Sequence, residues 1–206
     1  MRYLIIVLQF LIINHNAWGQ DKNLLLHQKH FDKELKEWTE TFNNFDLSVF
    51  KVEDTLHFDN NFKNDFSNYK KFLSTYKPII TYSSDSSQFI DIYSYQLNLE
   101  RKGNYYCATP DLEQVIFLCN PQKKYWNRIW FGTNSQWADE IIWISKTKFI
   151  LVGVIKSVDY KNKPFIFLGD TDKQILVSYL SKNKNSYQSK SGYSSPKLKR
   201  LRIRGI

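Results

Sequence analysis

A short sequence block that recurs fifty positions later constrains the fold of this chain more than any other feature. Ile116-Phe117-Leu118 returns as Ile166-Phe167-Leu168, and each copy is followed by a polar turn and another strand-like run. Two further strand-like runs precede each copy, so the chain carries one four-strand unit twice. A four-strand repeat of about 50 residues has the size of a β-propeller blade. Because a closed propeller needs at least four blades, we expect two blade-like sheets that pack on each other, on helices, or on a second copy of the chain.

The two units together span residues 78–181, where short runs of β-branched and aromatic residues alternate with turn residues. This pattern is typical of antiparallel sheets. The expected strands of the first unit are 78–82, 89–97, 116–118 and 126–131, and those of the second are 140–144, 149–155, 166–168 and 175–180.

Residues 20–77 contain no glycine or proline and carry apolar residues at helical spacing. This part predicts two helices. The first carries an apolar stripe from Leu24 to Phe42. The second is capped by Asp59, continues through Phe62, and must end before Pro78. The stretch 45–58 between them is ambiguous and could hold a short strand at 49–52. The expected fold is therefore α+β and mainly β, with an N-terminal helical pair packed against two four-stranded antiparallel sheets that do not form a closed propeller.

Residues 1–19 have the layout of a signal peptide. Arg2 gives a positive start, residues 3–13 are apolar except for Gln9, and Ala17 and Gly19 are small residues placed before a cleavage site at Gln20. The apolar run is shorter than the roughly 20 residues that a membrane-spanning helix needs. We therefore expect cleavage, export to the periplasm or the medium, and no membrane span in the mature protein. The alternative is a buried N-terminal helix or strand.

The segment Ser83-Ser84-Asp85-Ser86-Ser87 resembles the S-P-D-G-S turn of the blades in periplasmic Tol-type propellers, with serines in place of the proline and the glycine. More broadly, the stretches 76–95, 110–115 and 128–133 resemble a group of small uncharacterised exported proteins of Bacteroidetes-type bacteria. The resemblance covers roughly residues 70–170. It implies a blade-like β module behind a signal peptide, in a family without known catalytic residues.

The positive charge is concentrated at the C-terminal end. Of the 29 basic residues, one lies in the expected leader and eight lie in residues 182–206, which hold no acidic residue; the remaining 20 balance the 20 acidic residues of the chain. Residues 182–196 have the composition of a flexible linker, and the residues after them alternate partly as in an edge strand. This tail is a candidate site for an anionic polymer or surface, formed by Lys197, Lys199, Arg200, Arg202 and Arg204. The alternative is that the charges keep an edge strand from aggregating.

Four tryptophans lie between residues 126 and 143. Strand alternation would place Trp126, Arg128 and Trp130 on one face. Together with Trp137 they are candidate ligand-binding residues, because tryptophans beside an arginine can stack on sugar rings or form a hot spot for a protein partner. The alternative is that these tryptophans fill the space between two sheets.

Other chemistry is largely excluded. The chain has no G-x-S-x-G, H-E-x-x-H, Walker A or G-x-G-x-x-G motif, so we assign no catalytic residue, cofactor or metal site. His27, His30 and Glu34 are interpreted as a solvated helix flank. Cys107 and Cys119 could form a disulfide in an oxidising compartment, although a turn at residues 110–111 would place Cys107 opposite residues 115–116 instead.

We therefore expect an exported, non-enzymatic binding or scaffold module of the cell envelope that recognises a protein or an anionic or glycan polymer. Nucleic acid is not an expected partner, and association with a second copy of the chain is an alternative. Two other functions stay open. One is a glycan-acting hydrolase, which needs two converging carboxylates, and the other is an inhibitor or immunity-type protein.

Overall fold

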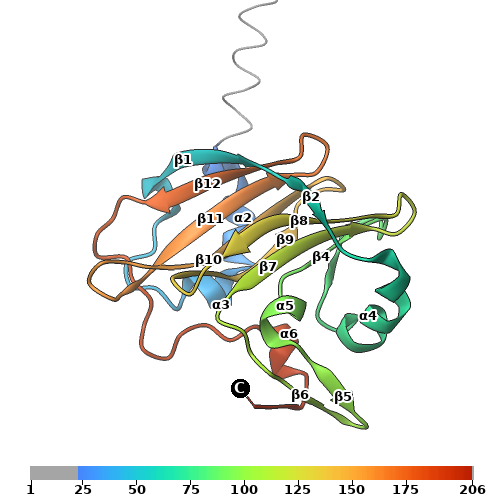
Figure 1. Cartoon of the computed structure of the whole chain (residues 1–206). Coiled ribbons are helices and arrows are strands. Elements are labelled where there is room, and N and C mark those ends of the chain that lie inside the picture. Colours follow the sequence, from blue (N-terminus) through green and yellow to red (C-terminus); the bar gives the residue numbers. More distant parts are fainter. Residues whose placement is uncertain (1–22, 206) are drawn as a thin grey trace, which may run out of the picture.

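The computed structural model of the chain describes residues 23–205 (Figure 1). The expected signal peptide at residues 1–19 lies outside the described residues. No helix within residues 23–205 has the length and apolarity needed to cross a membrane.

Two five-stranded antiparallel sheets form the body of the protein. The first sheet has the order β2-β8-β7-β4-β3, and the second has the order β1-β12-β11-β10-β9. The strands of the first sheet are β2 (Asp59–Lys63), β8 (Tyr125–Gly132), β7 (Gln114–Asn120), β4 (Phe89–Asp91) and β3 (Thr81–Tyr82). Those of the second are β1 (Phe50–His57), β12 (Ile175–Ser181), β11 (Asn162–Asp170), β10 (Lys148–Lys156) and β9 (Gln136–Trp143).

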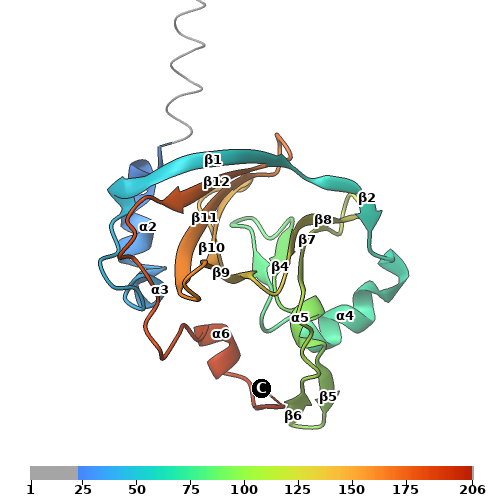
Figure 2. The same cartoon turned by 60° about the vertical axis from the view of Figure 1, so that its left-hand side comes forward.

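These sheets confirm the predicted duplication. Each four-strand unit forms one sheet, and the continuous β1–β2 segment adds a fifth strand to both, as Figure 2 shows along their shared edge. The strand registers of the two units also agree. Phe89 pairs with Cys119 in the first sheet, and Phe149 pairs with Gly169 in the second. Phe149 lies sixty positions after Phe89, and Gly169 lies fifty positions after Cys119. Two copies of one structural unit must pair their strands in the same register, and these two units do.

The two units stack face to back, which means that one face of the first sheet packs against the opposite face of the second sheet. In the first unit, Ile116 and Leu118 face the second sheet, whereas Phe117 faces outward. At the equivalent positions of the second unit, Phe167 faces the first sheet and Ile166 faces outward. Unlike faces therefore meet in the central core, as between neighbouring blades, whereas a two-fold symmetric sandwich would bring like faces together.

Helical segments cover the two outward faces (Figure 2). The second sheet is covered by the first helical segment and the residues that follow it, which bury Phe31, Leu35 and Trp38. The first sheet is covered by aromatic residues of the second helical segment, including Phe66, Tyr69 and Phe72. The first segment comprises η1 (Leu24–His27), α2 (Gln28–Asp32) and α3 (Lys36–Thr39) and leads to η2 (Leu47–Val49); the second comprises η3 (Phe66–Asn68) and α4 (Tyr69–Tyr76).

The expected N-terminal helical segments are present and pack against the β module, where each covers a different sheet. The predicted start of the second segment was wrong. Asp59 and Phe62 lie in β2, and it is Asp65 whose side chain caps the helical segment by accepting from the Ser67 N–H. Helix α4 does end at Tyr76, two residues before Pro78, as predicted. The ambiguous stretch before β2 forms strand β1.

The predicted strand 89–97 was too long. Strand β4 stops at Asp91, whose buried carboxylate accepts hydrogen bonds from the Tyr93 and Ser94 N–H groups at 3.1 and 3.0 Å. These bonds start helix α5 (Ser94–Leu97), which leads to a small hairpin that the sequence pattern did not predict. The hairpin strands β5 (Glu100–Lys102) and β6 (Tyr105–Cys107) are joined by β13 (Ile203–Arg204) in a three-stranded sheet.

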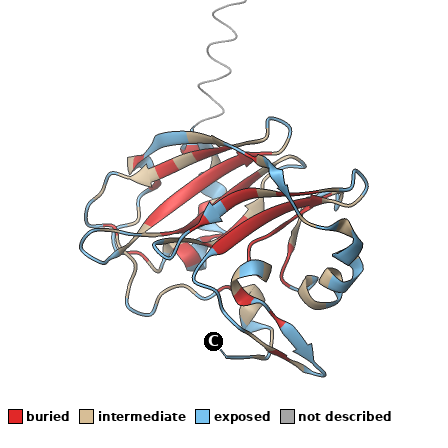
Figure 3. Cartoon of the chain, viewed as in Figure 1, coloured by how far each residue is buried: buried red, intermediate tan, exposed pale blue. Residues whose placement is uncertain are grey.

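The C-terminal segment runs along the body of the protein. It crosses the first helical segment, where the Asn43 N–H donates to the Tyr187 carbonyl at 3.0 Å and the Ser189 N–H donates to the Thr41 carbonyl at 2.8 Å. It then forms α6 (Pro196–Lys199) and the edge strand β13. Figure 3 shows how the buried residues concentrate on the central strands, and three apolar residues of this segment pack against that core: Leu198, Leu201 and Ile203.

Candidate functional site

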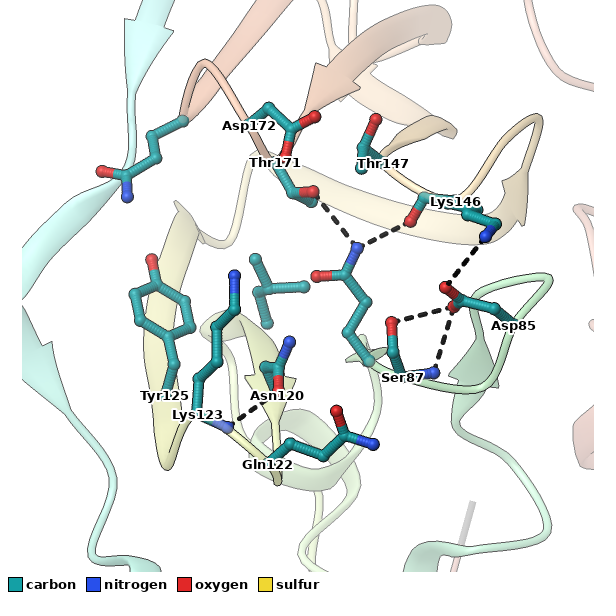
Figure 4. Close-up of a pocket in the computed structure, with 13 residues that line it drawn as sticks. Asp85, Ser87, Asn120, Gln122, Lys123, Tyr125, Lys146, Thr147, Thr171 and Asp172 are labelled. Atoms are coloured by element: carbon teal, nitrogen blue, oxygen red, sulfur yellow. Dashed lines mark hydrogen bonds and ion pairs between the residues drawn. The ribbon is translucent and has the colours of Figure 1, made fainter.

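A pocket of about 370 Å³ opens at the end of the two sheets where equivalent turns of both units meet. Its lining residues belong to the turns that connect β3 to β4, β7 to β8, β9 to β10 and β11 to β12 and to the strands beside them. These turns lie at the upper right of Figure 1. Figure 4 shows its lining, which consists of Asp85, Ser87, Gln88, Leu118, Asn120, Gln122, Lys123, Tyr125, Lys146, Thr147, Thr171, Asp172 and Gln174. The pocket therefore exists because the two units stack with their turns at the same end.

The turns after β7 and β11 have the same construction. The Asn120 side chain accepts from the Lys123 N–H at 3.0 Å, and the Asp170 side chain accepts from the Lys173 N–H at 3.0 Å. Each turn then closes on a residue in the left-handed conformation, Lys124 with φ 49° and Gln174 with φ 54°. Asparagine and aspartate stabilise such turns by bonding backbone N–H groups ahead of them. The internal repeat thus extends from the strands to the residues that shape the pocket.

The turn between β3 and β4 is the Ser83–Ser87 segment that resembles a propeller-blade turn. Asp85 accepts from the Ser83 hydroxyl at 2.9 Å, and from the N–H and hydroxyl of Ser87 at 3.1 and 2.8 Å. These hydrogen bonds lower the pKa of Asp85 to about 2, with a small further contribution from Lys146, whose ammonium lies 3.9 Å away. Ser86, in the glycine position of the motif, has the positive φ of 57° that glycine would favour.

Two amide side chains, of the buried Gln88 and the exposed Asn60, join the two sheets at the pocket. The Gln88 Nε2 donates to the Lys146 carbonyl at 2.7 Å and to the Thr171 hydroxyl at 3.2 Å, so a residue of the first sheet bonds two turns of the second. On the other side, Asn60 accepts from the Tyr125 hydroxyl at 3.1 Å and donates to Gln174 at 2.8 Å. These cross-links hold the pocket walls in place, because the turns cannot shift without breaking them.

The pocket offers many hydrogen-bonding groups and one aromatic ring. Tyr125 and Lys123 lie on one wall, and Thr147, Thr171 and Asp172 lie across from them (Figure 4). Amides supply both donors and acceptors, hydroxyls supply either, and the lysines donate only. Such a lining can bond a ligand that presents several hydroxyl groups, while the tyrosine ring packs on its apolar surface.

The tryptophans predicted to bind a ligand lie elsewhere, and they do not share a face. Strand β8 contains a β-bulge: Ile116 pairs with Trp130 and Phe117 with Arg128, which leaves Ile129 without a partner of its own. Trp126 is therefore buried beneath α4, with its ring 4.8 Å from that of Phe72. Trp130 is turned into the central core. The alternative interpretation, that these tryptophans fill the space between two sheets, applies to Trp130, whereas Trp126 fills the space between the first sheet and α4.

The other two residues of that expected site are also occupied within the fold. Arg128 forms an ion pair with Asp59, and its guanidinium lies 4.6 Å from the ring centre of Phe62 on the outer face of the first sheet. Trp137 is half-buried and packs against the core beneath the first helical segment. Neither residue lines the pocket.

The expected basic site in the tail is divided by the structure. Lys197 points inward, donates to the Thr81 hydroxyl at 2.8 Å, and forms an ion pair with the buried Glu140. Lys199 lies 3.5 Å from Glu37, and Arg204 stacks at 4.2 Å on the ring of Tyr105. Arg200 and Arg202 are exposed. Lys197 is therefore a structural residue, because its charge is already compensated.

The disulfide that the sequence left open is not formed. Cys107 and Cys119 are both free, because they belong to different sheets: Cys107 lies in β6, and Cys119 lies in the central strand β7. Within residues 23–205 no three metal-binding side chains gather into a group.

Sequence reasoning missed the pocket residues, although a signal for them was present. The repeat aligns Asn120 with Asp170 and Lys123 with Lys173, so the polar turns could have been recognised as equivalent. Comparison of the chain with protein-family models, with curated proteins and with solved structures finds no match.

Proposed function

We propose that the mature protein is an exported, non-enzymatic binding module and that the pocket between the turns holds a saccharide. The observation that carries this proposal is the pocket lining, in which four turns from two stacked units present amide, hydroxyl, lysine and tyrosine side chains around one space. The volume of about 370 Å³ lies within the range of small-ligand sites, about 300–1,000 Å³. Export is supported by the signal-peptide layout of residues 1–19.

The state of Asp85 favours binding over hydrolysis. A glycosidase needs one carboxylic acid with a raised pKa to protonate the leaving group, and a second carboxylate to act as base or nucleophile. Asp85 and Asp172 are the two carboxylates in the pocket. The pKa of Asp85 is lowered to about 2 by hydrogen bonds within its own turn, so it stays ionised and unable to donate a proton. The hydrolase alternative thus lacks a general acid at this position.

Calorimetric titration with a panel of oligosaccharides tests the proposal. The critical variant is Tyr125→Ile, because the second unit carries Ile175 at the equivalent position and shows that isoleucine fits this strand. We expect the wild type to bind at least one saccharide and Tyr125→Ile to lose at least tenfold in affinity with an unchanged circular dichroism spectrum. The matched control is Tyr95→Ile, which changes an exposed tyrosine of α5 outside the pocket.

Two outcomes would overturn the proposal. One is a wild-type protein that binds no member of the panel. The other is a Tyr125→Ile variant that binds as tightly as the wild type and the Tyr95→Ile control, since the tyrosine wall would then contribute nothing to recognition.

A further inference from the structure

We infer that the saccharide is acidic and that Lys123 binds its negatively charged group. This inference rests on the proposed function and specifies the ligand class of the same pocket. The charged group is a carboxylate, phosphate or sulfate, all of which present oxygen acceptors to an ammonium group.

The first argument is the position of Lys123. Its backbone N–H is held by the Asn120 side chain at 3.0 Å, which fixes the place where its side chain starts. That side chain lies along the pocket wall beside Tyr125 (Figure 4). No described residue forms an ion pair or hydrogen bond with its ammonium group. An ammonium beside an aromatic wall, with its charge uncompensated, is suited to an anionic substituent on a ring that packs against the tyrosine.

The second argument is the contrast with Lys146 on the opposite side. Lys146 has a carboxylate within reach, because Asp85 lies 3.9 Å from its ammonium group. The two sides therefore differ in charge. The wall of Lys123 favours an anion, whereas carboxylate oxygens near Lys146 accept hydrogen bonds from sugar hydroxyls, so the arrangement orients the ligand.

The third argument is the charge of the whole pocket end. The four turns together carry four lysines and two aspartates, namely Lys123, Lys124, Lys146 and Lys173 against Asp85 and Asp172. Asp85 accepts a hydrogen bond from a backbone N–H group of its own turn. The excess of positive charge attracts anions to the pocket mouth, and salt weakens such attraction.

The test uses carboxylated, phosphorylated and sulfated oligosaccharides, each paired with its uncharged counterpart of the same length. Calorimetric titrations are run with the full mature chain at low and at high salt. We expect one acidic member to bind at least tenfold more tightly than its uncharged counterpart, with a smaller difference at high salt. The identity of that member distinguishes a carboxylate from a phosphate or a sulfate.

Two substitutions locate the effect. Lys123→Gln should abolish the preference for the acidic member, and Lys123→Arg should keep it. The matched control is Lys124→Gln, since Lys124 is the exposed neighbour outside the pocket and the equivalent residue Gln174 shows that glutamine adopts the same left-handed conformation. Equal affinities of Lys123→Gln and Lys124→Gln for the acidic member would overturn the inference.

The failures of the two proposals look different. If uncharged and acidic saccharides bind equally and Tyr125→Ile abolishes both, the saccharide site stands and the inference about its ligand is wrong. If no saccharide of either kind binds, both are wrong.

Discussion

The ammonium group of Lys197 and the carboxylate of Glu140 form an ion pair that ties the C-terminal segment to strand β9. The side chain of Glu140 is only 6% exposed and that of Lys197 is 24% exposed. The other carboxylate oxygen of Glu140 accepts from the hydroxyls of Ser195 at 2.7 Å and Tyr193 at 3.2 Å. Every partner outside β9 thus comes from the last part of the chain, which fastens that part over the side of the core.

Removing the Lys197 ammonium should leave Glu140 buried without a counter-charge. We expect Lys197→Met to lower the free energy of unfolding by about 3–5 kcal/mol, as measured by urea denaturation. The control Lys199→Met breaks an exposed pair with Glu37 and should cost less than about 1 kcal/mol. Adding Glu140→Gln to Lys197→Met should restore much of the loss. A double variant as unstable as Lys197→Met would show that the charge of Glu140 is not the cause.

Asp139 should make the stability of the protein depend on pH. Burial raises the pKa of Asp139 to about 7, against hydrogen bonds from Trp38 and Trp137, and the charge of Glu140 contributes to the rise. Between about pH 4 and pH 7 the folded protein therefore binds a proton that the unfolded chain has released, so stability falls as the pH rises through this window.

In the wild type the Trp38 indole N–H donates to the Asp139 carboxylate at 3.0 Å. Asp139→Asn keeps an oxygen that can accept this hydrogen bond and removes the titratable carboxyl group. We expect the free energy of unfolding of the variant to exceed that of the wild type by an amount that grows from about 1 to about 4 kcal/mol as the pH rises from 4 to 8. Urea unfolding across that pH range measures this difference. Asp85→Asn is the control, since Asp85 with a pKa of about 2 titrates below this window. A constant difference between Asp139→Asn and the wild type at all these pH values would contradict the prediction.

Trp130 should be required for folding stability. Its ring lies 5.9 Å from that of Phe165 and 5.7 Å from that of Phe167, across the interface between the two sheets. We expect Trp130→Ala to cost about 3–5 kcal/mol, because a large cavity would be left in the core. Phe131→Ala, at the 39% exposed next position, should cost less than about 1.5 kcal/mol by the same thermal or urea melt. Similar losses for both variants would argue against the β-bulge that separates them.

The two cysteines should react very differently with thiol reagents. Cys119 is fully buried, and burial raises its pKa to about 12, whereas Cys107 is half-exposed. Because the thiolate is the reactive form, one thiol per chain should be labelled quickly by a maleimide and the second only after unfolding. Peptide mapping should place the fast label on Cys107. Two slow thiols, or a 107–119 disulfide found by mass spectrometry without reduction, would contradict the structure.

The sequence predicted the duplicated unit but not the faces of its strands. Ile116 and Ile166 occupy equivalent central strands, as the repeated block indicated. The face of Trp130 could not be predicted, because a single extra residue in β8 reverses the alternation and no composition signal marks a bulge. The start of the second helical segment was missed for a similar reason: Asp59 and Asp65 are both suitable caps, and pairing of β2 with β8 decides between them.

The pocket depends on relations that a linear pattern does not contain. The polar turns after β7 and β11 are visible as repeats, but their meeting requires the two units to stack with the same orientation. Gln88 is an example of a pocket residue that the sequence pattern could not identify. It follows a serine-rich turn in the sequence, and only the three-dimensional arrangement places its amide against two turns of the other sheet.

The face-to-back stacking of the two units also determines how many units one chain can hold. Because unlike faces pack together, such a stack has two unlike ends that could each accept one more unit. The first helical segment occupies one end and α4 occupies the other. These helices therefore cap the outward sheet faces and limit the stack to two units. Their loss would expose both faces, on which further copies of the protein could stack into a polymer.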